Sequence, residues 1–211
     1  MKPRLVIMLK EPMAGRVKTR LGRDIGMTAS AWWFRHQSAA LIRRLQSPRW
    51  ETMLFVAPDT ALRARCWPPH LPRLAQGRGD LGVRMVRGLG SSKLPVVLIG
   101  GDIPGVQQSH IARAFARLGR HELVFGPATD GGFWLVGKRG RVPHGLFENV
   151  RWSCDATLRD AISSARNTTV GMADSLSDVD TLSDMSLANS AVWRPLKQSP
   201  VRADAHTVLC R

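Results

Sequence analysis

The sequence predicts a three-layer α/β fold, in which helices cover both faces of a mainly parallel sheet. Short runs made only of apolar residues, such as residues 5–9 and 95–99, are typical of strands that are buried on both faces. Segments with apolar residues at helical spacing stand between several of these runs. Strands that alternate with helices in this way form the layers of α/β proteins.

Five apolar runs predict the strands. The first run leads into a polar segment, residues 10–28, which we expect to be a long loop. Pro58 and Asp59 close the second run, and paired glycines before Asp102 close the third. A turn-rich segment, residues 127–132, separates the last two runs. The runs cover residues 5–9, 53–57, 95–99, 123–126 and 133–137.

Four segments are predicted to be helices. In the third of them, apolar residues recur at positions i, i+3, i+4 and i+7, which gives a helix one apolar face. Asp80 and Asp155 stand where two of the helices are expected to begin, Asp155 as an N-cap. Three prolines between Cys66 and Pro72 exclude regular structure there. The helices are expected over residues 29–45, 80–89, 111–118 and 155–165.

The composition is that of a globular protein. Of the 211 residues, 44% are hydrophobic and 22% are charged, which excludes a disordered, collagen-like or coiled-coil chain. We expect a single domain over residues 1–191, followed by a poorly patterned tail over residues 192–211. No apolar run is long enough to span a membrane, and the first run lacks the features of a secretory signal. The protein is therefore expected to be cytoplasmic, without a membrane partner.

The cysteines and histidines exclude two kinds of site. The three cysteines stand far apart with no C-x-x-C pair, which excludes a disulfide framework and a zinc site built from cysteines. The six histidines include neither an H-E-x-x-H motif nor a clustered pair. A catalytic metal held by histidines is therefore not expected.

The net charge of +15 comes from 31 basic and 16 acidic residues, and the excess lies mainly in the first 73 residues. A surface of this sign attracts anions, such as phosphorylated small molecules or nucleic acid. Nucleic acid is not expected as a partner, because the chain has no lysine- or arginine-rich run, no helix-turn-helix signature and no platform of aromatic and basic residues. The charge also has a simpler explanation, since arginine occurs in every segment, as a coding bias would produce.

The loop expected after the first strand carries the residues of a phosphate-binding site. Gly15 allows the backbone to approach a ligand closely, Lys18 supplies a point charge, and the guanidinium groups of Arg16 and Arg20 bind phosphate oxygens in pairs. Lys10 adds a fourth cation. The loop is not a Walker A motif, because that motif needs a glycine directly before its lysine. By itself the pattern fits a solvated basic loop equally well.

Acidic residues follow later strands. Asp102 is a candidate ligand for Mg²⁺ or Mn²⁺, which keep other coordination positions for water and phosphate oxygens. Asp130, on a Gly-Gly turn, is placed to accept a hydrogen bond from a sugar or acceptor hydroxyl. Asp178 and Asp180 lie on opposite sides of an extended segment, and Asp180 is our candidate second metal ligand. The alternatives are that Asp102 caps a turn and that Asp130 closes a tight hairpin.

Six motifs stand in a specific order along about residues 4–187. In this order they resemble a bacterial family, the radical-SAM/selenodomain-associated transferases, which are GT-A-like glycosyltransferases also placed in arsenosugar biosynthesis. The motifs are KxPxxGRVKTRL at residues 10–21, QGRGDLGxRM at 76–85, GDIP at 101–104, GPAxDGGFWLVG at 126–137, WS at 152–153 and DVDT at 178–181.

The resemblance implies a nucleotide-diphospho-sugar transferase of the GT-A fold, related to guanylyltransferases whose first loop carries a similar Lys-Thr-Arg-Leu segment. It implies that Lys18 and Arg20 hold phosphates, that Asp102 binds the metal ion, and that Asp130 faces the acceptor. It also places the segment 76–84 beside the nucleotide. In that segment the candidate contacts are Gln76, Gly79 and Arg84, the last of them to a phosphate.

These observations favour a metal-dependent transferase that moves a sugar from a nucleotide-diphospho-sugar to a small-molecule acceptor. In this hypothesis Lys18, Arg20 and the metal ion stabilise charge on the diphosphate leaving group, and Asp130 acts as the general base or orients the acceptor. The closest alternative is nucleotidyl transfer from an NTP to a phosphorylated acceptor. A third possibility, a non-catalytic protein that binds anions or nucleic acid, leaves the acidic motifs without a role.

Overall fold

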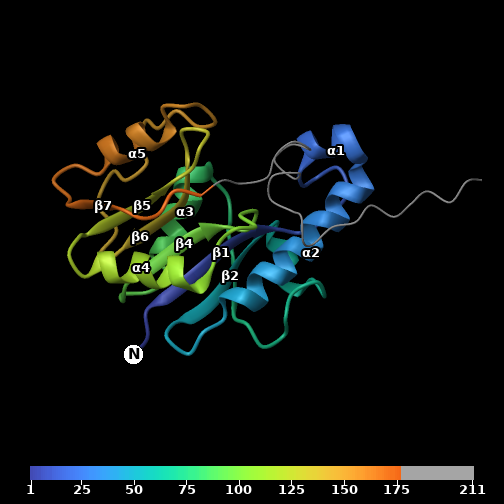
Figure 1. Ribbon diagram of the computed structural model, residues 1–211, viewed down its shortest axis with the longest axis horizontal. Helices are drawn as coiled ribbons and strands as arrows, with labels where there is room; N and C mark the ends of the chain where they lie inside the picture. Colours follow the sequence, from blue (N-terminus) through green and yellow to red (C-terminus); the bar gives the residue numbers. More distant parts are fainter. Residues whose placement is uncertain (177–211) are drawn as a thin grey trace, which may run out of the picture.

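The computed structural model describes residues 1–176, which form one seven-stranded sheet with helices on both faces (Figure 1). Asp178, Asp180 and the expected tail over residues 192–211 lie outside the described residues. The strands are β1 (Arg4–Lys10), β2 (Glu51–Ala57), β3 (Arg73–Ala75), β4 (Val96–Gly100), β5 (Leu123–Pro127), β6 (Phe133–Lys138) and β7 (Val170–Met172).

The strand order is β3-β2-β1-β4-β6-β5-β7. Strand β1 pairs in parallel with β2 and β4, while β6 runs antiparallel to both of its neighbours, β4 and β5. The reversal has a local cause, because the turn between β5 and β6 is far too short for the crossover that a parallel pair needs. The mainly parallel α/β sheet predicted from the sequence is therefore confirmed.

The helices form an outer layer on each face of the sheet. One core contains Leu5 and Ile7 of β1 together with side chains of α1, α2 and α4. The other contains Val6 of β1 with side chains of α3 and α5. Because neighbouring residues of one strand enter different cores, the apolar run of β1 is buried on both faces, as its composition predicts. The helices are α1 (Thr19–Ile25), α2 (Met27–Leu45), α3 (Leu81–Leu89), α4 (Gln108–Leu118) and α5 (Thr157–Ser164), with a short 3-10 helix at Asp59–Arg63.

Parts of the prediction were wrong in detail. The segment expected to be a loop over residues 10–28 contains α1, which has seven residues and buries Leu21. An added Cβ at Gly22 would lie 2.6 Å from the sulfur of Met27, so α1 depends on close packing against α2. Strands β3 and β7, of three residues each, are too short to show a periodic pattern.

Two expected helix starts have different outcomes. Asp80 caps α3, and its carboxylate accepts a hydrogen bond from the backbone N–H of Val83 at 2.8 Å. Asp155 is not the N-cap of α5, which begins one residue later, after Ala156. The proline-rich stretch 66–72 has neither helix nor strand, as expected. Within residues 1–176, every helix is too short or too polar to cross a membrane.

Candidate active site

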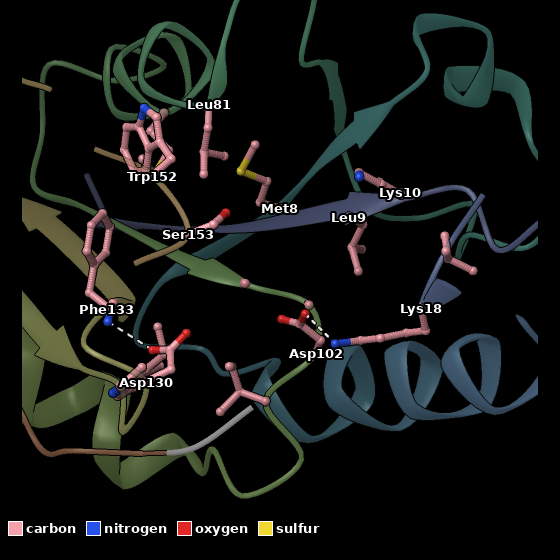
Figure 2. Close-up of a pocket in the computed structure, with 18 of the residues that line it drawn as sticks. Met8, Leu9, Lys10, Lys18, Leu81, Asp102, Asp130, Phe133, Trp152 and Ser153 are labelled. Atoms are coloured by element: carbon pink, nitrogen blue, oxygen red, sulfur yellow. Dashed lines mark hydrogen bonds and ion pairs between the residues drawn. The ribbon is translucent and has the colours of Figure 1, made fainter. Parts of the chain in front are cut away.

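A cavity of about 510 Å³ opens at the carboxyl ends of β1 and β4 (Figure 2). After these neighbouring strands the chain continues toward opposite edges of the sheet, since β2 and β3 lie beyond β1 while β6, β5 and β7 lie beyond β4. Open α/β sheets bind ligands at such a point. The volume is within the range of small-molecule sites.

An ion pair between Lys18 and Asp102 joins the loops that follow β1 and β4. The Nζ atom of Lys18 lies 2.8 Å from Oδ2 of Asp102, and the side chain of Lys18 is only 6% exposed, against 33% for Asp102. Lys18 has a left-handed backbone conformation, with φ 45° and ψ 47°. For a residue other than glycine this conformation costs about 1–2 kcal/mol. The loop is therefore held in an unfavourable conformation that aims its lysine into the cavity.

Gly101 explains how the two strand ends come so close. A Cβ added at Gly101 would lie 2.2 Å from Cδ2 of Leu9 and 3.0 Å from the carbonyl oxygen of Met8. Any larger residue would push the end of β4 away from β1. The glycine before Asp102 thus lets the carboxylate face the loop that carries Lys18.

The cations that line the cavity all come from one short segment, from the end of β1 to the start of α1. Among the described residues these are Lys10, Arg16, Lys18 and Arg20. Gly15 is not in the lining, but its φ of 74° makes the turn that precedes Arg16. Four positive charges around one carboxylate make this end of the cavity, which we call the cationic end, attractive to a polyanion.

Gln76 lines the cavity from the side of β2 and is 1% exposed. Its Nε2 donates hydrogen bonds to the carbonyl oxygens of Leu9, at 3.0 Å, and of Phe55, at 2.8 Å. Both amide hydrogens are thereby used, and Oε1 has no partner within residues 1–176. Two other predicted nucleotide contacts, Gly79 and Arg84, do not line the cavity, and the Nε atom of Arg84 donates instead to the Gly79 carbonyl at 2.9 Å.

Asp130 lies at the opposite end of the cavity from Lys10 and Lys18 (Figure 2). Its Oδ1 accepts a hydrogen bond from the backbone N–H of Gly132 at 2.9 Å, which fixes the side chain on the turn between β5 and β6. Gly131, with φ 84°, lets this turn touch the next loop, because an added Cβ would lie 2.3 Å from Cα of Asp155. The turn and the loop 150–156 are therefore packed together.

Aromatic side chains form the wall beside Asp130. The rings of Phe133 and Phe147 are stacked at 5.9 Å between centroids, and the ring of Trp152 lies 6.4 Å from Phe133. Phe133 and Trp152 line the cavity together with Met8 and Leu81. We call the part formed by these four side chains, with Asp130 and Ser153, the aromatic end (Figure 2).

The loop that carries Trp152 and Ser153 is clamped at its base. Arg151 donates to both carboxylate oxygens of Asp160, with distances of 2.8 and 3.0 Å. This interaction lowers the pKa of Asp160 to about 2 and raises that of Arg151. The hydroxyl of Thr157 donates to the carbonyl oxygen of Arg151 at 2.8 Å. These contacts fix the direction in which the loop enters the cavity.

The structure thus brings seven of the predicted site residues into one cavity, from segments far apart in the sequence. Sequence reasoning assigned no role to Trp152 and Ser153, although the pair was part of the motif set, and did not single out Met8 or Leu81. That these residues bind substrate stays a prediction. The seven are Lys10, Arg16, Lys18, Arg20, Gln76, Asp102 and Asp130.

Residues 1–176 contain no group of three or more acidic, histidine or cysteine side chains that could hold a metal ion by themselves. Asp102 is the carboxylate that fits the prediction, because it lines the cavity beside the cations and its side chain is one-third exposed. Magnesium is commonly held by one or two carboxylates and by phosphate oxygens of the substrate. The donor set of the described residues therefore fits an ion that arrives with a phosphorylated ligand.

Comparison with known proteins assigns the chain to a family. Residues 40–154 match the family described as "Uncharacterized protein conserved in bacteria (DUF2064)". The chain belongs to this family. The match includes the ends of β2 and β4, the turn with Asp130, and the loop with Trp152 and Ser153. No protein of curated function matches this DUF2064 chain in sequence.

Solved structures share the fold. A protein from Desulfovibrio desulfuricans, named provisionally as a nucleotide-diphospho-sugar transferase, superposes with a TM-score of 0.79 at 27% identity over 89% of this chain and 86% of its own. A 4-diphosphocytidyl-2C-methyl-D-erythritol synthase from Anaerococcus prevotii gives 0.56 at 10% identity, over 89% and 96% of the two chains. A CMP:2-keto-3-deoxy-manno-octonic acid synthetase complexed with CTP gives 0.53 at 10% identity, over 89% and 96%. The fold of this DUF2064 protein is therefore that of nucleotide-diphospho-sugar transferases and nucleotidyltransferases.

Proposed function

We propose that this protein is a glycosyltransferase that moves a sugar from a nucleotide-diphospho-sugar to a small-molecule acceptor. The observation that carries the proposal is the placement of four cations and Asp102 where β1 and β4 end, next to a part of the same cavity without lysine or arginine in its described lining. A diphosphate is the group that fits the cationic end. The similarity to the transferase from Desulfovibrio desulfuricans supports the same donor class.

In this proposal the loop after β1 binds the diphosphate. The guanidinium groups of Arg16 and Arg20 each offer paired donors to phosphate oxygens. Lys18 adds a point charge beside the same diphosphate. As the bond to the sugar breaks, negative charge grows on the diphosphate, and these fixed cations stabilise it more than they stabilise the bound donor. Lys10 lies at the same end and adds to the positive potential.

Asp102 is the residue proposed to hold Mg²⁺ or Mn²⁺, and Asp180 is proposed as a second ligand. A bound divalent ion would supply further neutralisation of the diphosphate charge. The ion pair with Lys18, at 2.8 Å, balances the charge of Asp102 within the protein. Asp130 is proposed to orient the acceptor hydroxyl and to accept its proton, because its carboxylate lies at the other end of the cavity from the cations.

Nucleotidyl transfer from an NTP is the second candidate, supported by the fold shared with the two nucleotidyltransferases. It would use the same cations but would release pyrophosphate instead of a nucleoside diphosphate. The first loop lacks the tight glycine-rich, arginine-containing signature common in sugar nucleotidyltransferases, which favours glycosyl transfer.

Product analysis tests the proposal and separates the two candidates. The protein is incubated with Mn²⁺, nucleotide sugars or NTPs, and an extract of small metabolites as the source of acceptor. Release of a nucleoside diphosphate from a nucleotide sugar supports glycosyl transfer, whereas release of pyrophosphate from an NTP supports the alternative. Arg16→Ala should reduce the release, while Arg23→Ala, an exposed arginine of α1 outside the cavity lining, should not. Release of neither product contradicts both proposals.

A further inference from the structure

The two ends of the cavity differ in charge, and the difference restricts what the aromatic end can bind. All lysines and arginines in the described lining come from residues 10–20, at the cationic end. At the aromatic end the polar groups are the carboxylate of Asp130 and the hydroxyl of Ser153, set among Met8, Phe133 and Trp152 (Figure 2). A phosphate placed there would meet a negative charge with no cation beside it. The aromatic end is therefore suited to an uncharged group.

Two features of Ser153, its backbone conformation and the direction of its hydroxyl, make it a candidate ligand contact. It has a left-handed backbone conformation with φ 61°, although it is not a glycine. Its side chain is exposed in the open cavity, and its hydroxyl points toward the centre of the cavity and makes no hydrogen bond to any residue within 1–176 (Figure 2). Residues held in such conformations concentrate at ligand-binding sites, where the surrounding structure enforces them.

The surroundings of Ser153 do enforce its conformation. The Arg151–Asp160 pair and the hydrogen bond of Thr157 to the Arg151 carbonyl hold one side of the loop. Contact of the Trp152 ring with the tilted ring of Phe147, at 5.9 Å between centroids, holds the side that faces the cavity. The loop is thus built to present one hydroxyl at a fixed position, which is what recognition of a polar ligand requires.

We propose that Ser153 binds the second substrate of the transfer, and that this acceptor is an uncharged, hydroxyl-bearing ring rather than a phosphorylated compound. An ionised Asp130 accepts hydrogen bonds but donates none, so it pairs with hydroxyl groups of the ligand. Ser153 can both donate and accept. The faces of Trp152 and Phe133 cover the apolar side of the ring. This inference rests on the proposed function, since it assigns the donor diphosphate to the cationic end.

Saturation-transfer NMR tests the inference on the full-length protein. The protein is first saturated with Mg²⁺, which is diamagnetic, and with the nucleoside diphosphate, UDP or GDP, that raises its melting temperature most. The probes are the methyl α-glycosides of glucose, galactose and mannose, together with the 6-phosphates of the same three sugars. We expect saturation transfer to at least one neutral glycoside and none to the phosphates.

The variants Ser153→Ala and Ser153→Gly should weaken glycoside binding by about 2- to 10-fold, the effect of one lost hydrogen bond. Glycine adopts the left-handed conformation of residue 153 without a steric cost. Loss of glycoside binding in both variants therefore points to the hydroxyl and not to a disturbed loop. Asn149→Gly, at a residue just before this loop that also has positive φ (58°) and lies outside the cavity lining, should bind glycosides as the wild type does.

Three results would overturn the inference while the proposed function stands: preferred binding of the sugar phosphates, no binding of any glycoside by a protein that binds the nucleotide, or unchanged glycoside binding in both Ser153 variants. Loss of nucleotide binding in the Ser153 variants would also overturn it, because Ser153 would then serve the donor. If neither UDP nor GDP raises the melting temperature of the wild type, the proposed function fails, and the inference fails with it.

Discussion

The ammonium group of Lys18 lies 2.8 Å from the carboxylate of Asp102, so the loop after β1 and the loop after β4 are joined by an ion pair inside the candidate active site. The two residues are 84 positions apart in the sequence. Their meeting follows from the sheet order, since β1 and β4 are parallel neighbours whose carboxyl ends lie side by side. A cation and a carboxylate in contact at such a place suit a ligand that brings both phosphate and a divalent ion.

We predict that Lys18→Met weakens binding of a nucleoside diphosphate by about 10- to 100-fold, because a charge-assisted hydrogen bond to phosphate contributes about 1.5–3 kcal/mol. Asp102→Asn should keep binding in the absence of a divalent ion but lose the gain that Mn²⁺ gives the wild type. Isothermal titration calorimetry of both variants with UDP and GDP, with and without Mn²⁺, measures these effects. Equal affinity of wild type and Lys18→Met would exclude Lys18 from phosphate binding.

Gln76 should contribute to stability as well as to the site. Its amide group joins β1 and β2 by donating hydrogen bonds to the carbonyl oxygens of Leu9 and Phe55, and the residue is 1% exposed. Gln76→Leu leaves both carbonyl oxygens without this donor and should lower the free energy of unfolding by about 1–3 kcal/mol. Urea denaturation at pH 7 measures the change. A Gln76→Leu protein as stable as the wild type would show that these hydrogen bonds contribute nothing net.

Gly131 should resist substitution because the turn and the next loop touch at this residue. In Gly131→Ala the new Cβ would lie 2.3 Å from Cα of Asp155, at a φ of +84°. The variant should lose about 1–3 kcal/mol of stability and should bind substrates poorly, since Asp130 and Ser153 flank this contact. Gly140→Ala is the matched control, because a Cβ there meets nothing within 4 Å. Similar melting temperatures for the two variants would contradict the packing described.

The clamp between Arg151 and Asp160 predicts a pH dependence. The pKa of Asp160 is lowered to about 2 by its hydrogen bonds to Arg151, from an ordinary value of 3.8. A carboxyl group whose pKa is lower in the folded than in the unfolded state stabilises the fold above the unfolded value, and this stabilisation is lost as pH falls toward 2. Asp160→Asn should therefore melt below the wild type at pH 7, and the gap should close between about pH 4 and pH 2.

Melting temperatures of the wild type and Asp160→Asn across this range check the prediction. Asp24→Asn, at an exposed residue of α1 outside both the clamp and the cavity lining, serves as the control for a simple change of charge. A gap between wild type and Asp160→Asn that stays constant down to pH 2 would mean that the clamp does not depend on the ionised carboxylate.

Local sequence patterns were enough to predict five of the seven strands and four of the five α-helices of the described residues. The apolar runs of β1 and β4 are continuous because both faces of these strands are buried, and that feature is visible without any knowledge of the fold. The same runs located the loops with Lys18 and Asp102. These loops had to meet if the strands were parallel neighbours, and the structure shows that they do.

What the sequence did not predict depends on contacts between distant segments. Helix α1 has seven residues and no side-chain cap, so its stability comes from packing against α2 rather than from a local signal. The position of Ser153 depends on Asp160, Phe147 and Phe133 together, and no single pattern contains all of them. Gly79 and Arg84, which were predicted to contact the nucleotide, lie outside the cavity lining, and the Nε atom of Arg84 donates to the Gly79 carbonyl at the start of α3.

The most direct test of the account is calorimetric titration of the protein with UDP-glucose, GDP-mannose, UTP and GTP in the presence of Mn²⁺, with Arg16→Ala and Arg23→Ala as a matched pair. We expect that at least one nucleotide sugar binds to the wild type, that affinity falls at least about tenfold in Arg16→Ala, and that Arg23→Ala binds normally. If the wild type binds none of the four nucleotides, or if both arginine variants bind equally well, the cavity at the ends of β1 and β4 is not a nucleotide-diphosphate site.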